Sequence, residues 1–363
     1  MRSWRRTRFQ KPSDTSRNFL KTLVDPPGAT IDIVAVHGLN PLDKPSHAEA
    51  TWTAGNKLWL RDFLPKRVPS ARVLLFGYNS NVAFQTAAAG VREQAENLLN
   101  QLEAARVMDP DRPLMFICHS LGGIIVKRAL VHSKTDTTYE RIGKSTFGIA
   151  FFGTPHKGGN NAGLADVIAK IARSLLGNPS NSFMSAIRAG TLFLDTIADD
   201  FRQLLEDFQI LTFYETKPLG SFGIVVSPSS AILGLSGTRE KRIAMDTDHR
   251  NLCKFECEND PRYEQVAVNI VKMVNDATSP RETPAPIEAE DKGNVSRCIG
   301  DQNTIFQSGD GNQSDIYGHI NMTHQMGNRN YSEQDGDNNK TMQITMGALA
   351  VEGYAELLKF FSS

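Results

Sequence analysis

The feature that most constrains this chain is the segment 113–123, PLMFICHSLGG, in which an apolar run ends in a serine followed by two glycines. A strand that breaks sharply into a helix strains the residue at the turn and requires small neighbours. Gly122 and Gly123 are such neighbours of Ser120. At a helix N-terminus the free N–H groups favour developing negative charge. The segment therefore predicts a nucleophile elbow that presents the Ser120 hydroxyl.

One position departs from the usual G-x-S-x-G pattern, because Cys118 stands where the first glycine is normal. Cysteine is small enough to fit that place. The alternative interpretation is a buried strand and a tight turn in which Ser120 only caps the helix. Short motifs match by chance often enough that the rest of the chain has to decide.

Length and composition limit the number of domains, the class of partner and the cellular compartment that we expect. The chain has 363 residues, enough for one large α/β domain and an appendage. Acidic and basic residues balance at 40 each, so no global field favours nucleic acid as a partner. The four cysteines are too sparse for a disulfide framework, which favours a reducing, cytoplasmic setting. No run resembles a signal-peptide core or a membrane span, so we expect a soluble protein.

Residues 19–277 alternate short apolar runs with longer amphipathic ones, the pattern of a doubly wound, mostly parallel sheet. We expect an α/β-hydrolase fold, with a helical cap inserted at 162–206; ordinary packing helices are the alternative for this insertion. The expected strands are 31–36, 72–78, 114–118, 146–152, 209–214 and 223–226, and the expected helices include 91–105, 123–131 and 263–275.

The remaining segments differ in composition. Residues 1–18 form a basic arm that we expect to be disordered, and 278–292 is a linker rich in proline and acidic residues. The last segment, 347–363, has apolar residues on one face of a short amphipathic helix.

The tail, 293–346, is a polar repeat with a period of nine. Such a repeat predicts a parallel β-solenoid or stacked cross-β structure with asparagine ladders, and a disordered tract is the alternative. Calcium-binding nonapeptide repeats need paired glycines and a repeating aspartate, so no metal is expected. Glycine recurs at Gly300, Gly309, Gly318, Gly327 and Gly336, and the ladder asparagines are Asn294, Asn303, Asn312, Asn321, Asn330 and Asn339.

The partners of Ser120 follow from chain order, which in this fold runs serine, acid, histidine. His249 follows the last expected strand and opens an expected helix, so it is the predicted general base. Glu215 ends an expected strand and is the predicted acid, with Asp248 and Asp246 as alternatives. Chain order excludes the histidines in the tail and those before the serine as general base. His132 lies on an expected helix and His156 in a glycine-rich turn, so neither is the preferred base.

The oxyanion is expected to bind the backbone N–H groups of Leu39 and Leu121. Supporting residues are those beside these two amides and the serine, namely His37, Gly38, His119 and Gly122. The chemistry requires neither a metal nor a cofactor.

The motifs together resemble the fungal SesB-like branch of the lipase-related α/β hydrolases. They occur in order as DIVAVHGL, TW, LP, RVLLFGYN, FICHSLGG, FFGTPHKGG, FYET and DHRNLCKF. In that family a cysteine before the HS pair is normal, and its triad corresponds to Ser120, Glu215 and His249. The tail resembles the sigma-type amyloid signalling motif of fungal death-pathway proteins.

The resemblance implies an effector of programmed cell death. A NACHT or other STAND receptor with a matching motif would template self-assembly of the tail. Assembly would activate the hydrolase against an ester or lipid substrate, and the activated protein could contact a membrane surface. Two alternatives remain: a catalytically inactive adaptor that acts only through its tail, and a housekeeping esterase with an inert tail.

Overall fold

The structure is a computed structural model of the chain. It describes residues 18–40, 44, 46–80, 88–158, 163–177 and 179–278, together with six short strands between 295 and 344. The chain divides into two compact units, Met1–Ser279 and Pro280–Ser363, and each is described by itself. The basic arm up to residue 17, the linker from residue 279 onward, the ladder asparagines and the segment 347–363 lie outside the described residues.

The first unit is built on a seven-stranded sheet in the order β1-β5-β2-β6-β7-β8-β9. Only the edge strand β1 runs antiparallel to its neighbour, and the other pairs are parallel. This is an α/β-hydrolase-like fold. The strands are β1 (Phe19–Val24), β2 (Ile31–Val36), β5 (Ala71–Gly77), β6 (Leu114–His119), β7 (Thr146–Phe152), β8 (Gln209–Glu215) and β9 (Glu240–Met245), and a small hairpin joins β3 (Thr53–Ala54) to β4 (Lys57–Leu58).

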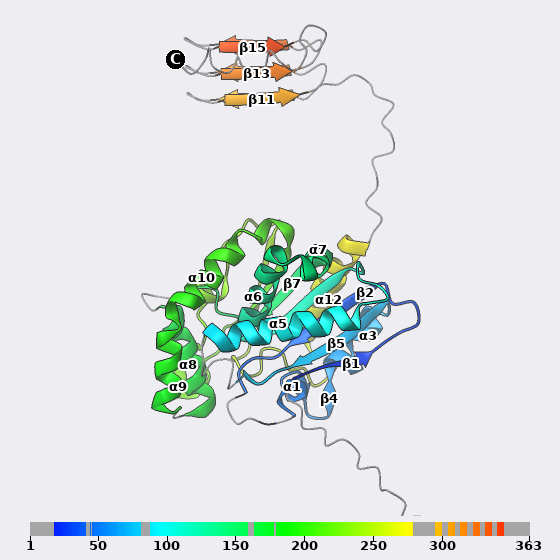
Figure 1. The fold of residues 1–363 in the computed structure, drawn as a ribbon, viewed down its shortest axis with the longest axis vertical. Helices are drawn as coiled ribbons and strands as arrows, with labels where there is room; N and C mark the ends of the chain where they lie inside the picture. Colours follow the sequence, from blue (N-terminus) through cyan, green and yellow to red (C-terminus); the bar gives the residue numbers. More distant parts are fainter. Residues whose placement is uncertain are drawn as a thin grey trace, which may run out of the picture. The chain divides into compact units, whose positions relative to one another are not determined.

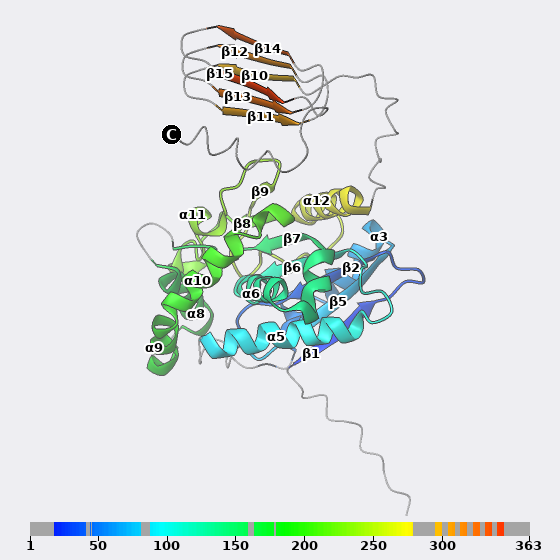
Figure 2. The same ribbon diagram turned by 45° about the horizontal axis from the view of Figure 1, so that its top comes forward.

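Helices cover both faces of the sheet, as two separate hydrophobic clusters show. Alternate residues of β2 divide between them, Val34 and Val36 facing one cluster and Ile33 and Ala35 the other. In Figure 1, α5 and α6 lie over the near face, and Figure 2 shows the strands between α5 and α12. The central strands are therefore buried on both faces, which explains their continuous apolar sequence.

The helices of the sheet are α1 (His47–Ala50), α2 (Trp59–Asp62), α3 (Leu64–Arg67), α5 (Ala88–Ala105), α6 (Gly122–Thr135), α7 (Glu140–Ser145), α11 (Pro228–Ala231) and α12 (Pro261–Thr278). The insertion expected at 162–206 contains three more, α8 (Leu164–Leu176), α9 (Asn181–Ala189) and α10 (Thr191–Arg202). Their apolar residues Ile168, Ile171 and Ile197 join the cluster on the α6 side of the sheet.

The expectation of a strand at 223–226 is wrong. This segment follows a short turn of helix and forms bends, although Val225 and Val226 are buried. The last strand of the seven-stranded sheet is instead β9, whose sequence EKRIAM places Glu240, Ile243 and Met245 inward between exposed residues. The edge strand β1 was also not expected from the sequence.

A buried carboxylate fixes the start of β2. Asp32 is completely buried and accepts hydrogen bonds from Arg72 at 2.8 Å and Arg112 at 3.1 Å, and it also pairs with Arg106. Arg106 is itself 2 % exposed. The carboxylate therefore compensates three guanidinium groups that draw β2, β5 and the end of α5 together.

We expect Asp32→Asn to lower the free energy of unfolding by about 3–5 kcal/mol, because it leaves buried guanidinium groups without an anion. Urea unfolding would measure the change. Glu264→Gln is the matched control: it breaks the exposed pair with Arg67, and we expect a loss below about 1 kcal/mol. Equal losses for both variants would contradict the role assigned to Asp32.

The second unit contains six five-residue strands in two parallel sheets, ordered β10-β12-β14 and β11-β13-β15. Val295 pairs with Gln313 and Gln313 with Tyr331, so each strand pairs with the strand eighteen residues further on, two sequence periods away. The strands are β10 (Val295–Ile299), β11 (Thr304–Ser308), β12 (Gln313–Tyr317), β13 (Met322–Met326), β14 (Tyr331–Asp335) and β15 (Lys340–Ile344).

Within the described residues, no helix combines the length and apolar character that crossing a bilayer requires.

Candidate active site

The turn between β6 and α6 holds a serine in a strained conformation. Ser120 has φ 51°, the only positive φ of a non-glycine residue in the described part of the chain. Its N–H donates to the Phe152 carbonyl at 2.8 Å, and its carbonyl accepts from the Thr154 hydroxyl at 2.9 Å. These bonds to the end of β7 hold the strained turn in place.

The two glycines after the serine are required by close packing. A Cβ on Gly122 would lie 2.3 Å from the His37 carbonyl oxygen, and one on Gly123 would lie 2.4 Å from the Thr154 hydroxyl oxygen. No such demand falls on Cys118, whose side chain is buried in the core cluster on the α6 side. A small apolar residue at that place is thus compatible with the elbow.

The structure brings Ser120, His249 and Glu215 together although 34 residues separate the last two. His249 Nε2 lies 2.9 Å from Ser120 Oγ, and its Nδ1 lies 2.6 Å from Glu215 Oε2. Each of the three is 1 % exposed. The order of contacts is that of a serine, a base and an orienting carboxylate.

The other oxygen of the carboxylate is also occupied. Glu215 Oε1 accepts the backbone N–H groups of Val225 at 2.6 Å and Val226 at 3.0 Å. Because these N–H groups are engaged by a side chain, the segment contributes to the site rather than to the sheet. The sequence gives no direct signal for this clamp, since it depends on where the chain returns after β8.

The base is carried by a turn after β9 and not by a helix, which corrects that expectation. The turn is made by Asp248, whose carboxylate accepts the N–H groups of Arg250 at 2.9 Å and Asn251 at 3.1 Å. Asp246 instead pairs with the exposed Lys217 at 2.7 Å. Neither alternative acid is therefore the partner of the imidazole.

Two neutral histidines support the site. His119 Nε2 lies 3.1 Å from the His249 carbonyl, so this nitrogen carries the proton and donates. Burial, and next the neighbouring His249, hold the pKa of His119 well below its usual value. The bond ties the end of β6 to the turn that carries the base, a contact that the sequence does not reveal.

His37 supports the loop after β2 in the same way. Its Nδ1 donates to the Gly38 carbonyl at 2.7 Å and its Nε2 accepts the Tyr78 N–H at 3.2 Å. Burial lowers the pKa of His37 to about 3, and the ring stacks on Tyr78. The neutral ring thereby fixes the Gly38 peptide unit.

The loop that His37 fixes passes close to the serine. A Cβ on Gly38 would lie 3.0 Å from the Ser120 Cβ. Leu39 is buried and lines the same cavity as Ser120, while Leu121 begins the turn into α6. Neither amide N–H of these two leucines donates to another described residue, so both remain available for an oxyanion.

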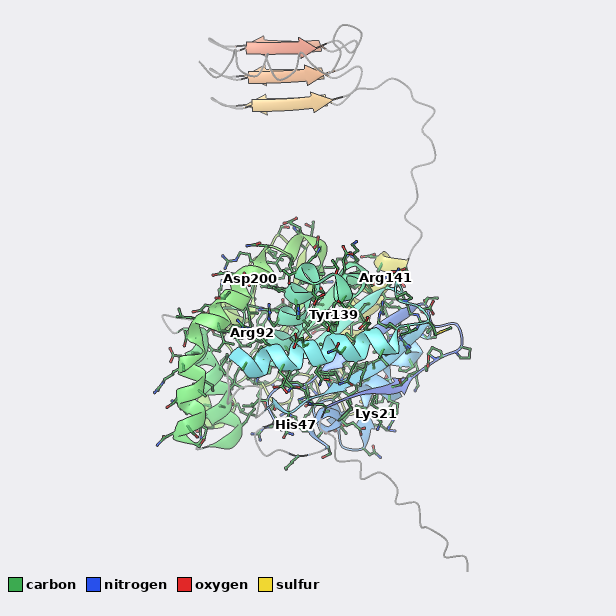
Figure 3. All side chains as sticks on the ribbon, in the orientation of Figure 1. Lys21, His47, Arg92, Tyr139, Arg141 and Asp200 are labelled. Atoms are coloured by element: carbon green, nitrogen blue, oxygen red, sulfur yellow. The ribbon has the colours of Figure 1, made fainter. Side chains whose placement is uncertain are left out.

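A cavity of about 340 Å³ opens beside Ser120, a size that suits a small-molecule ligand. Leu175 of α8 reaches its wall, so the insertion helps to shape it. Figure 3 labels His47, the cavity residue that begins α1, and shows it well away from Asp200 on α10. The described lining is Leu39, Asn40, Lys44, His47, Ala50, Thr51, His119, Ser120, Leu175, Arg250 and Lys254.

Among the residues with described positions, no group of three or more histidine, cysteine or acidic side chains could hold a metal ion.

The sheet, the elbow and the three converging side chains have the arrangement of an α/β-hydrolase fold. In its sequence the chain is similar to the protein SERAC1. It is 31 % identical to the human protein over 224 residues, which is 59 % of this chain and 32 % of SERAC1. The zebrafish protein is 28 % identical over 211 residues, 54 % of this chain and 30 % of that protein. The chain thus spans about a third of the length of these relatives.

No model of a protein family matches the chain. Among solved structures, the Bacillus licheniformis lipase BlEst2 aligns with a TM-score of 0.47 at 17 % identity, covering 70 % of this chain and 98 % of the lipase. The monoacylglycerol lipase of Paleococcus ferrophilus aligns with a TM-score of 0.40 at 12 % identity, covering 72 % and 100 % of the two chains.

Proposed function

We propose that this chain is a serine hydrolase that cleaves an ester or acyl-lipid bond, with Ser120 as nucleophile, His249 as general base and Glu215 as orienting acid. The observation that carries the proposal is the unbroken hydrogen-bonded series from Ser120 Oγ through both ring nitrogens of His249 to Glu215. A serine that only capped a helix would have no need of a buried imidazole and carboxylate in line.

The reaction follows from these positions. Ser120 Oγ attacks the ester carbonyl while His249 Nε2 takes its proton, and the oxyanion that forms accepts the N–H groups of Leu39 and Leu121. The imidazolium then protonates the departing alcohol, leaving an acyl group on Ser120. Water, deprotonated by His249, attacks this acyl-enzyme, and the carboxylic acid departs as the serine regains its proton.

An active-site fluorophosphonate tests this function directly, because it reacts only with an activated serine. We expect one adduct on the folded chain, located at Ser120 by peptide mass spectrometry, and none on the chain unfolded in urea. Absence of labelling on the folded chain would favour the inactive adaptor.

We also propose that the tail drives self-assembly and couples the hydrolase to a NACHT or other STAND receptor in a programmed cell-death pathway. The eighteen-residue pairing step of the strands supports the self-assembly, because parallel in-register strands are the arrangement that identical chains can extend. On this proposal the protein is cytoplasmic and reaches a membrane surface after activation.

The test of the tail uses the full chain. We expect seeded growth of fibrils, and we expect replacement of Asn303, Asn312 and Asn321 by aspartate to slow it through like-charge repulsion, with partial rescue by salt. A chain that stays monomeric when seeded, and whose activity and assembly are unchanged by deletion of residues 293–363, would instead be a housekeeping esterase with an inert tail.

A further inference from the structure

Three basic side chains share the cavity of Ser120. Lys44 precedes α1, while Arg250 and Lys254 follow the base in the turn after β9. No aspartate or glutamate is present in the described part of the cavity lining. Two segments distant in the sequence thus place positive charge beside one serine.

These charges are not neutralised within the described structure. None of the three forms an ion pair with a described residue, and the Arg250 guanidinium donates only to the Ser174 carbonyl, at 3.3 Å. The carboxylate of Asp248, the acid closest in sequence to Arg250, is occupied by backbone N–H groups and by the Asn251 side chain at 2.9 Å. Among the described residues, the positive charge at the cavity is therefore left without a counter-ion and is available to a ligand.

The two imidazoles of the cavity respond to this charge. Burial, and next Lys254, lower the pKa of His47 to about 4, and Lys44 lowers it further. Lys254 also contributes to the depressed pKa of His119. Both rings are neutral at pH 7, so the positive potential of the cavity comes from the lysines and the arginine and not from the imidazoles.

We propose that the cavity selects acyl esters that carry an anionic group, a phosphate or a carboxylate, near the scissile bond, and that Lys44, Arg250 and Lys254 bind this group. The inference rests on the proposed function, whose substrate class it narrows. Arginine and lysine are the side chains that bind phosphate and carboxylate oxygens, and a cavity wall excludes part of the water that would otherwise screen them.

A second explanation is that the charges only stabilise the oxyanion of the transition state. In that case they would accelerate the hydrolysis of neutral and anionic esters alike, since both form the same oxyanion. If the charges instead bind an anionic group of the substrate, they raise the rate of hydrolysis of the anionic ester relative to that of the neutral ester. The ratio of the two rates therefore separates the explanations.

The experiment compares 4-nitrophenyl butyrate with the mono-4-nitrophenyl ester of glutaric acid, which has the same leaving group and a carboxylate at the end of its acyl chain. We expect Lys254→Gln and Arg250→Gln each to lower kcat/KM for the anionic ester about tenfold and to leave the neutral ester within about twofold. Lys241→Gln, an exposed lysine on β9 outside the cavity, is the control and should change neither rate. Equal losses on both esters, or no loss on either, would overturn the proposal.

A binding measurement separates this proposal from the proposed function. Calorimetry on full-length Ser120→Ala with glycerol 3-phosphate, with glutarate and with glycerol needs no turnover, and the first two distinguish phosphate from carboxylate. We expect binding of at least one anion, weakened about tenfold by Lys254→Gln, and none of glycerol. If neither anion binds, the inference is wrong even if fluorophosphonate labels the wild type. If an anion binds but fluorophosphonate does not label the wild type, only the proposed hydrolase function is wrong.

Discussion

Ser120→Ala should lower kcat/KM for an ester substrate roughly a million-fold, because removal of the nucleophile from such a triad abolishes nearly all covalent catalysis. The variant should also lose fluorophosphonate labelling. Its stability should change little, since alanine meets the same backbone strain at φ 51° as serine and only one hydrogen bond, to His249, is removed. Steady-state kinetics and thermal unfolding together test both parts.

Ser133→Ala is the matched control for this variant. Ser133 is a buried serine on α6, and its hydroxyl donates to the Leu130 carbonyl at 2.8 Å. We expect this change to leave turnover intact. If Ser120→Ala retained wild-type turnover, another residue would be the nucleophile and the proposed mechanism would be wrong.

Much of the site could be predicted because its sequence signals are local. The elbow combines an apolar strand, a serine and two glycines, and each glycine is required by an atom that lies within 2.4 Å of its missing Cβ. Chain order then leads to Glu215 and His249, because successive parallel strands end at the same edge of the sheet. A short motif and a topological rule thus lead to three residues that meet in space.

Other parts of the fold could not be predicted because long-range contacts determine them. The apolar segment 223–226 has the composition of a strand, but its N–H groups at Val225 and Val226 bind the carboxylate of Glu215. The strand β9 contains three charged residues, and its inward residues become evident only when it pairs with β8. Tertiary contacts override local propensity at both places.

The same limit applies to the histidines around the triad. His119 looks like a spacer between the strand and the serine, yet it binds the carbonyl of His249, 130 residues away. His37 is adjacent to the oxyanion loop in sequence, but its second bond is to Tyr78, which follows the end of β5 and lies 41 residues away in the sequence. Only the fold brings these partners together, so a pattern in one sequence could assign them no more than a supporting role.

Glu215→Gln should lower kcat about ten-thousand-fold although the two side chains have nearly the same shape. The position of Oε1 faces two N–H donors, from Val225 and Val226, so the amide oxygen of glutamine must occupy it. The amide NH₂ group then faces Nδ1 of His249 and donates to it. This places the imidazole proton on Nε2, where it points at Ser120 Oγ and the ring can no longer accept the serine proton.

Comparison with Glu215→Ala tests this argument, because alanine leaves either tautomer of the imidazole accessible. We expect Glu215→Gln to be at least as inactive as Glu215→Ala while unfolding at a higher temperature, since glutamine still accepts the two N–H groups that alanine leaves unpaired. Nitrogen NMR of a labelled His249 would report the tautomer directly, with the proton on Nδ1 in the wild type and on Nε2 in Glu215→Gln. A glutamine variant that kept near wild-type activity would show that the carboxylate does not set the tautomer of the base.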